Sequence, residues 1–210
     1  KYVFNTGALS IDNLQSLALL TTQQFLDQFG VDLGKPTLLI TFHPETVSFG
    51  RNREYAQQLC ASLLELSTVF QVLITMPNAD TMGNVIREQI VELDGKKKDG
   101  IFVFENLGTI GYLSAMKHCT MLVGNTSSGF VEASYFPKWV VNLGNRQDGR
   151  LMTDNIRTIA VEEKQIIDTV KDLSKLPVSL VKHPYGNGIA ASMMVTHIKE
   201  FLKLNKPASN

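Results

Sequence analysis

Five short apolar runs recur through the middle of the chain, and longer stretches of mixed polar and apolar residues separate them. The runs are rich in Val, Ile, Leu and Phe and cover residues 37–43, 71–77, 101–106, 121–125 and 139–144. Runs of this length and composition predict buried β-strands. The stretches between them carry apolar residues at helical spacing, which predicts helices over residues 52–67, 81–93, 109–118 and 128–136.

The alternation of strand and helix predicts the fold class. Strands that are apolar throughout are covered on both faces, as happens in parallel sheets whose crossover helices pack on either side. We therefore expect an α/β fold, a doubly wound parallel sheet of the Rossmann-like type. Ligands of such sheets bind at the carboxyl ends of the strands, so the residues that follow each strand are the first candidates for function.

Further elements are expected on both sides of this core. A strand in the first residues is followed by a long helix over residues 10–29, which ends at Gly30. Beyond the last core strand, the pattern predicts a strand over residues 155–161 and helices over residues 162–173 and 188–204. Because the chain opens with a strand that leads directly into a helix, we expect it to begin inside a larger architecture.

Composition limits the kinds of partner that the protein can bind and the places in the cell where we expect it. Twenty Lys and Arg residues balance twenty Asp and Glu residues, so no net charge attracts nucleic acid or an anionic membrane. No stretch of about eighteen apolar residues is present. Cys60 and Cys119 lack metal-ligand spacing, which argues against both a disulfide framework and a metal site. We expect a cytoplasmic protein with no metal and no cofactor.

The segment after the strand at residues 121–125 is the most informative one. Thr126, Ser127 and Ser128 open the helix expected there, and free N–H groups at a helix start bind anions such as phosphate. The alternative is that these residues only cap the helix. Glu132 lies one helical turn further, where it can accept hydrogen bonds from the two ribose hydroxyls of a nucleotide or simply complement the helix dipole.

Two other strand ends carry groups suited to the same anion. His43 ends the first core strand before Pro44, and it can donate to a diphosphate oxygen or protonate a leaving group. An ordinary strand-end histidine is the more common case. Arg146 and Arg150 follow the fifth strand, and an arginine binds phosphate through two parallel hydrogen bonds. Turn formation is sufficient to explain four other polar residues, Asn78, Asp80, Tyr185 and Asn187.

The order and spacing of six motifs resemble a known family. The motifs are GALSIDNL, TFHPET, PNAD, GNTSSGFVEA, NLGNRQDGR and HPYGNG. Together they resemble the hydrolysing UDP-N-acetylglucosamine 2-epimerases of sialic-acid and related nonulosonate biosynthesis, from about Gly7 to the last helix. The sequence departs from the family at His183 and Asn187, where family members usually have Asn and Asp. This departure puts in doubt any role for an acidic group there.

The resemblance implies a domain organisation and a reaction. Family members are two-domain enzymes of the GT-B type that bind UDP mainly through the C-terminal domain. Residues 1–30 would then be an interdomain strand and helix segment, and residues 31–210 the nucleotide-binding C-terminal domain, without its N-terminal partner domain. In the family, a base removes the C2 proton while UDP leaves C1, and water then adds to give N-acetylmannosamine and UDP. Two carboxylates of the N-terminal domain perform the acid and base steps.

The resemblance also implies roles for individual residues. Thr126 and Ser127 would bind the diphosphate and Glu132 the ribose, while His43 and Arg146 would lie near the diphosphate and leaving group. Main-chain atoms near one further residue, Leu107, would contact the uracil. His43 would be the only direct catalytic participant in this chain, and the whole enzyme is expected to be a homo-oligomer. The alternatives are a sugar-nucleotide-binding module without chemistry and a GT-B glycosyltransferase, which the TFHPET and NLGNRQDGR motifs disfavour.

Overall fold

A single six-stranded parallel sheet forms the centre of the molecule. The computed structural model describes residues 3–45, 49–77, 83–96, 98–178 and 184–204. The strands lie in the order β3-β2-β1-β4-β5-β6 and every neighbouring pair is parallel. Their bounds are β1 Thr37–Thr41, β2 Gln71–Thr75, β3 Ile101–Phe104, β4 Met121–Gly124, β5 Trp139–Leu143 and β6 Ile156–Ile159. The fold class predicted from the sequence is confirmed.

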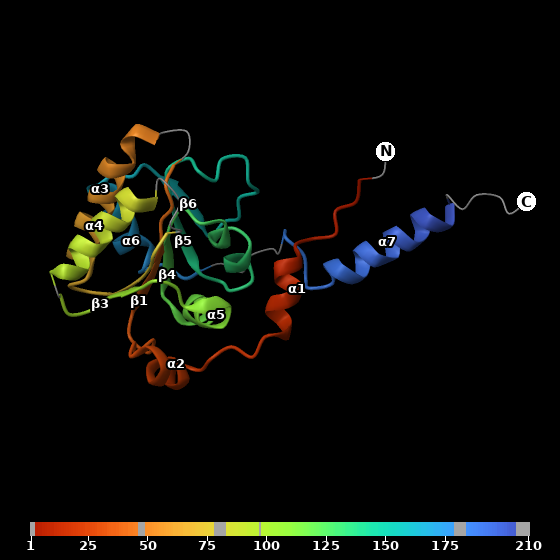
Figure 1. The fold of residues 1–210 in the computed structure, drawn as a ribbon, viewed down its shortest axis with the longest axis horizontal. Helices are drawn as coiled ribbons and strands as arrows, with labels where there is room; N and C mark the ends of the chain where they lie inside the picture. Colours follow the sequence, from red (N-terminus) through yellow and green to blue (C-terminus); the bar gives the residue numbers. More distant parts are fainter. Residues whose placement is uncertain (1–2, 46–48, 78–82, 97, 179–183, 205–210) are drawn as a thin grey trace, which may run out of the picture.

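Helices cover both faces of this sheet and form a core on each side (Figure 1). One face packs against α3 (Asn52–Leu66), α4 (Gly83–Gly95) and α6 (Glu163–Leu173), and the other against α5 (Gly108–His118) and α2 (Thr22–Phe29). Successive strand residues point to opposite faces, so Leu38 lies in the first core and Leu39 in the second. Burial on both faces explains why the strands are apolar throughout.

The order of the strands reverses direction at β1. From β1 the chain winds outward through β2 to β3, and it then returns to the other side of β1 to form β4, β5 and β6. The carboxyl ends of β1 and β4 therefore lie side by side at a topological switch point, which is the usual ligand-binding position in doubly wound sheets.

The last helix, α7 (Ala190–Leu204), projects away from the sheet beside α1 (Leu9–Ser16) (Figure 1). The carboxylate of Asp12 in α1 accepts hydrogen bonds from the first two main-chain N–H groups of α7, at 3.0 and 2.8 Å. Apolar side chains of α7 are exposed, among them Ile198 and Leu202. Within the part of the chain that the structure describes, no helix is long and apolar enough to cross a membrane.

Three local expectations were wrong. The helix expected over residues 10–29 is two helices, because Thr21 and Gln24 form a capping box that starts α2 anew. Residues 3–8 contain no strand. The helix expected over residues 128–136 is replaced by two short 3-10 turns, η2 (Ser127–Gly129) and η3 (Glu132–Ser134). The strand β6 and the helices α3, α4, α5, α6 and α7 form where the sequence predicted them, within two residues at each end.

Candidate nucleotide-binding site

A cavity of about 470 Å3 opens at the carboxyl ends of β1, β2 and β3. His43 and Thr41 border it from the β1 end, and Leu107 and Thr109 border it from the start of α5. The structure thus brings His43 and Leu107, which are 64 residues apart in the sequence, to the same cavity. Both residues lie on the side of the sheet where a ligand is expected.

A second cavity of about 230 Å3 adjoins the first and is bordered by Ser128 and Glu132. The two cavities share Thr109 and Tyr112. The hydroxyl of Tyr112 lies 3.3 Å from Thr41 Oγ1. Burial raises the pKa of this hydroxyl, while hydrogen bonds to Thr41 and Ser128 act in the opposite direction. Tyr112 therefore remains a neutral hydroxyl between the two cavities at ordinary pH. No motif or strand-end position in the sequence singled it out.

The turn after β4 lies next to these cavities. Thr126 caps η2, and its hydroxyl accepts a hydrogen bond from the N–H of Ser128 at 3.4 Å. Among the described residues, the N–H groups of Thr126 and Ser127 have no acceptor. Hydroxyl and N–H donors are therefore gathered where the sequence predicted an anion site. The donors come from a tight turn rather than from the first turn of an α-helix.

The replacement of the expected helix by short turns also bears on Glu132. Its simple structural explanation was that its carboxylate complements the dipole of a helix over residues 128–136, but only two three-residue 3-10 turns form there. Such short turns have little aligned dipole to complement. Glu132 instead borders the second cavity together with Ser128. This position favours a ligand-binding role.

Arg146 is held against the end of β4. Its Nη1 atom donates to the main-chain oxygen of Asn125 at 3.1 Å, and its main-chain N–H donates to Oε1 of the buried Glu45, also at 3.1 Å. Arg150 does not take part in this contact, because its Nε atom donates to Oε1 of Gln147. The structure thus brings Arg146 next to the turn at residues 126–128.

Comparisons with known proteins identify the family of this chain. A family model described as UDP-N-acetylglucosamine 2-epimerase matches residues 1–199. This chain belongs to that family. It is 33% identical over 156 residues to a GDP/UDP-N,N'-diacetylbacillosamine 2-epimerase (hydrolyzing) of Campylobacter jejuni, which covers 74% of this chain and 40% of that relative. A Legionella pneumophila UDP-N,N'-diacetylbacillosamine 2-epimerase (hydrolyzing) is 27% identical over 186 residues, 89% of this chain and 48% of that relative.

Solved structures agree on the fold of this epimerase family. The UDP-N-acetylglucosamine 2-epimerase of Neisseria meningitidis, bound to UDP-N-acetylglucosamine, superposes with a TM-score of 0.77 at 19% identity, over 93% of this chain and 54% of that one. The S. aureus MnaA–UDP co-structure gives a TM-score of 0.75 at 19% identity, over 98% and 55%. This member of the epimerase family spans about half the length of the curated relatives it matches.

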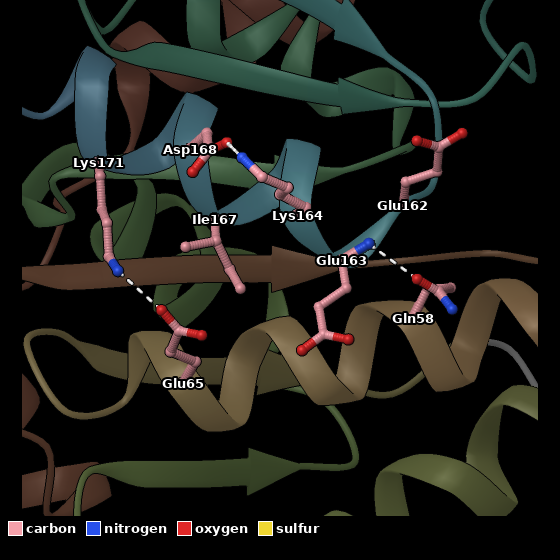
Figure 2. A pocket seen from close by; sticks show the side chains of 8 residues that line it. All are labelled: Gln58, Glu65, Glu162, Glu163, Lys164, Ile167, Asp168 and Lys171. Atoms are coloured by element: carbon pink, nitrogen blue, oxygen red, sulfur yellow. Dashed lines mark hydrogen bonds and ion pairs between the residues drawn. The ribbon is translucent and has the colours of Figure 1, made fainter.

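Another cavity of this epimerase-family chain, of about 510 Å3, lies between α3 and α6 (Figure 2). Four of its charged side chains form two ion pairs: Lys171 with Glu65 at 2.8 Å, and Lys164 with Asp168. These four side chains are largely exposed on the surfaces of the two helices. We assign no function to this groove.

The remaining candidates from the sequence have structural explanations or lie outside the described residues. The hydroxyl of Tyr185 donates to the main-chain oxygen of Leu151 at 3.2 Å, and Gln15 donates to that of Asn187 at 2.6 Å. Asn78, Asp80 and His183 lie outside the described residues.

Burial raises the pKa of the thiols of Cys60 and Cys119 to about 12, and neither cysteine forms a disulfide. Within the described ranges, no three His, Cys, Asp or Glu side chains are grouped as metal ligands.

Proposed function

We propose that this chain is the UDP-binding C-terminal half of a hydrolysing UDP-N-acetylglucosamine 2-epimerase, which releases N-acetylmannosamine and UDP. The observation that carries the proposal is the meeting of His43, Arg146 and the hydroxyl-rich turn at residues 126–128 at the switch point of the sheet, in a member of this family. The hydrolysing type is supported by the names of the relatives from C. jejuni and L. pneumophila.

The proposed nucleotide contacts follow the two adjoining cavities. Thr126, Ser127 and Ser128 bind the diphosphate through hydroxyl and main-chain N–H donors. Glu132 accepts hydrogen bonds from the ribose hydroxyls, and the main chain near Leu107 contacts the uracil. The solved structures that contain UDP or UDP-N-acetylglucosamine support a nucleotide as the ligand.

The proposed contribution to the reaction is electrostatic. Negative charge grows on the UDP diphosphate as the bond from C1 to oxygen breaks, and donors fixed in advance stabilise that charge most effectively. Arg146 supplies a permanent positive charge beside the turn. His43 donates a hydrogen bond or a proton to the departing diphosphate, a role that an imidazole side chain can perform. The acid and base carboxylates for the C2 proton belong to the other half of the enzyme.

The proposal includes a partner domain that packs on this chain. Residues 1–30 form the segment between domains and residues 31–210 the nucleotide-binding domain. The exposed apolar side chains of α7, such as Ile198 and Leu202, and Phe4 near the N-terminus offer a surface for the other half. The complete enzyme is proposed to be a homo-oligomer in the cytoplasm, where the two free thiols remain reduced.

Two experiments test the proposal. Calorimetric titration of this chain with UDP should show weak binding, whereas Arg146→Ala should lower the affinity. Arg157→Ala is the matched control, because Arg157 also donates Nη1 to a main-chain oxygen, at 2.9 Å, but does so at the start of β6. No binding of UDP by the wild-type chain would refute the proposal.

The second experiment concerns catalysis. UDP-N-acetylglucosamine should be turned over only when this chain is part of the longer protein, and the products should be N-acetylmannosamine and free UDP. Turnover by the chain alone at about one per second, a typical enzyme rate, would contradict the assignment of the carboxylates to the other half. Formation of UDP-N-acetylmannosamine by the longer protein would contradict the hydrolysing type.

A further inference from the structure

Asn125 forms a two-point contact with the main chain of His43. Its side chain is fully buried. Oδ1 accepts a hydrogen bond from the N–H of His43 at 2.7 Å, and Nδ2 donates to the oxygen of His43 at 2.8 Å. The last paired residues of the two strands are Thr41 and Gly124, so the side chain of Asn125 continues the pairing of β1 and β4 beyond their ends.

The main chain of the same residue binds the loop after β5. Its oxygen accepts hydrogen bonds from Nη1 of Arg146 at 3.1 Å and from Nε2 of Gln147 at 2.7 Å. Gln147 is itself 5% exposed, so this contact is shielded from water. One residue therefore connects the ends of three strands, and it immediately precedes the turn at residues 126–128.

A second asparagine completes the arrangement. Asn52, at the start of α3, accepts from the N–H of Glu45 at 2.8 Å and donates to its oxygen at 3.1 Å. The carboxylate of Glu45, which is 3% exposed, in turn accepts the N–H of Arg146. The bonds thus run from His43 through Asn125 to Arg146, and from Arg146 through Glu45 to Asn52. Buried networks whose members are paired in this way hold a single arrangement, because any displacement leaves a polar group without a partner.

We propose that Asn125 is a positioning residue that holds His43, Arg146 and the turn at residues 126–128 in the arrangement that binds the diphosphate. This inference rests on the proposed function. Asn125 need not touch the ligand, because it acts through Arg146 and through the position of the His43 main chain. Donors that are already oriented bind a developing or existing anionic charge without a further cost of reorganisation.

A matched control, Asn155, lies at the amino-terminal end of β6. Asn155 is also fully buried; its Nδ2 donates to the main-chain oxygen of Lys138 at 2.6 Å, and its Oδ1 accepts from Thr153 at 2.6 Å. It precedes β6 and lies away from the carboxyl ends of the strands. Replacing either asparagine by leucine keeps the approximate size, adds no charge and removes both amide bonds.

The test compares UDP affinities of the full 210-residue chain by calorimetry. Asn125→Leu should weaken UDP binding by about tenfold, which corresponds to the loss of roughly one hydrogen bond to a charged group. Asn155→Leu should lower the unfolding midpoint but leave the UDP affinity within about twofold of wild type. Circular dichroism checks that each variant is folded, and Asn125→Ser replaces Asn125→Leu if leucine prevents folding.

A double-mutant cycle separates positioning from a general loss of stability. Because Asn125 acts partly through Arg146, the loss of UDP affinity in the variant carrying both Asn125→Leu and Arg146→Ala should be smaller than the sum of the two single losses. Fully additive losses, or wild-type affinity in the folded Asn125 variants, would overturn this inference and leave the proposed function intact. Failure of the wild-type chain to bind UDP would overturn the proposed function and this inference with it.

Discussion

Two cavities of similar volume differ in how their polar groups are held. The cavity at the strand ends, of about 470 Å3, lies beside buried amides and main-chain groups whose hydrogen bonds link three strands. The groove between α3 and α6, of about 510 Å3, is bordered by long side chains on exposed helix surfaces (Figure 2). The side chain of Lys164, for example, is 88% exposed.

Cavity volume alone therefore does not identify the region better suited to bind an anion. Ion pairs between exposed side chains contribute little, because water already solvates both charges and the side chains lose freedom on pairing. Buried hydrogen bonds are costly to break and fix the direction of each donor. A ligand that carries negative charge therefore gains more from the strand ends than from the larger groove.

The largest effect is expected from a substitution that prevents the close approach of β1 and β4, on which the cavity at the strand ends depends. Gly124 has a φ angle of 148°, and an added Cβ would overlap the main-chain oxygen of Thr41. Gly124→Ala should therefore lower the free energy of unfolding by about 3 kcal/mol or more. Urea denaturation measures the loss. In the control Gly95→Ala, the added Cβ has no neighbouring atom within 4 Å, so the free energy of unfolding should change by less than about 1 kcal/mol.

The next prediction concerns the ligand rather than the fold. Glu132→Gln keeps the size of the side chain and removes its charge. If the carboxylate accepts both ribose hydroxyls, UDP binding should weaken by roughly 1.5–3 kcal/mol while stability is nearly unchanged. Calorimetry and thermal unfolding on the same two proteins check both parts. Unchanged UDP affinity in the folded variant would contradict the ribose assignment of Glu132.

How well each region could be predicted depends on how local its causes are. The strands and the helices α3 to α6 follow from apolar residues at regular spacing, because burial imposes that spacing directly on the sequence. The break between α1 and α2 has a local and a distant part. The capping box of Thr21 and Gln24 is a local helix-start pattern that a single helix over residues 10–29 overlooks. The hydrogen bond from the N–H of Leu20 to the hydroxyl of Ser114, 94 residues away, has no local signal in the sequence.

The residues of the candidate site also differ in how far the sequence predicts them. His43, Ser127 and Arg146 could be selected because each lies at or just after the end of a predicted strand and carries a group suited to phosphate. Asn125 could not be selected, because an Asn before Thr and Ser resembles an ordinary turn residue. Its role emerges only when the fold brings it to His43, which is 82 residues earlier in the sequence.

A smaller effect is expected where α7 joins the rest of the chain. Asp12→Ala removes the carboxylate that accepts the N–H groups of Ala190 and Ala191. Loss of such a cap costs about 1 kcal/mol, so hydrogen exchange at these two amides should accelerate by roughly fivefold or more. Exchange at Ala115 in the buried α5 serves as the internal reference, and unchanged exchange at the start of α7 would show that Asp12 is not its cap.

The smallest effect is expected in the groove between α3 and α6. Lys171→Met removes the ion pair with Glu65 and should change the free energy of unfolding by less than about 0.5 kcal/mol. UDP affinity should stay at the wild-type value. A clear loss of UDP affinity in this variant would reverse the comparison between the two cavities.

The most direct test of the account is to locate UDP on the chain by titrating an isotope-labelled sample and following the main-chain amide resonances by NMR. If UDP binds at the carboxyl ends of the strands, the largest shifts should cluster at His43, Gly108, Thr126, Ser127 and Arg146. Shifts centred on Gln58, Glu65 and Lys171 in the groove of Figure 2, or no shifts at all, would contradict the assignment of the strand ends as the UDP site.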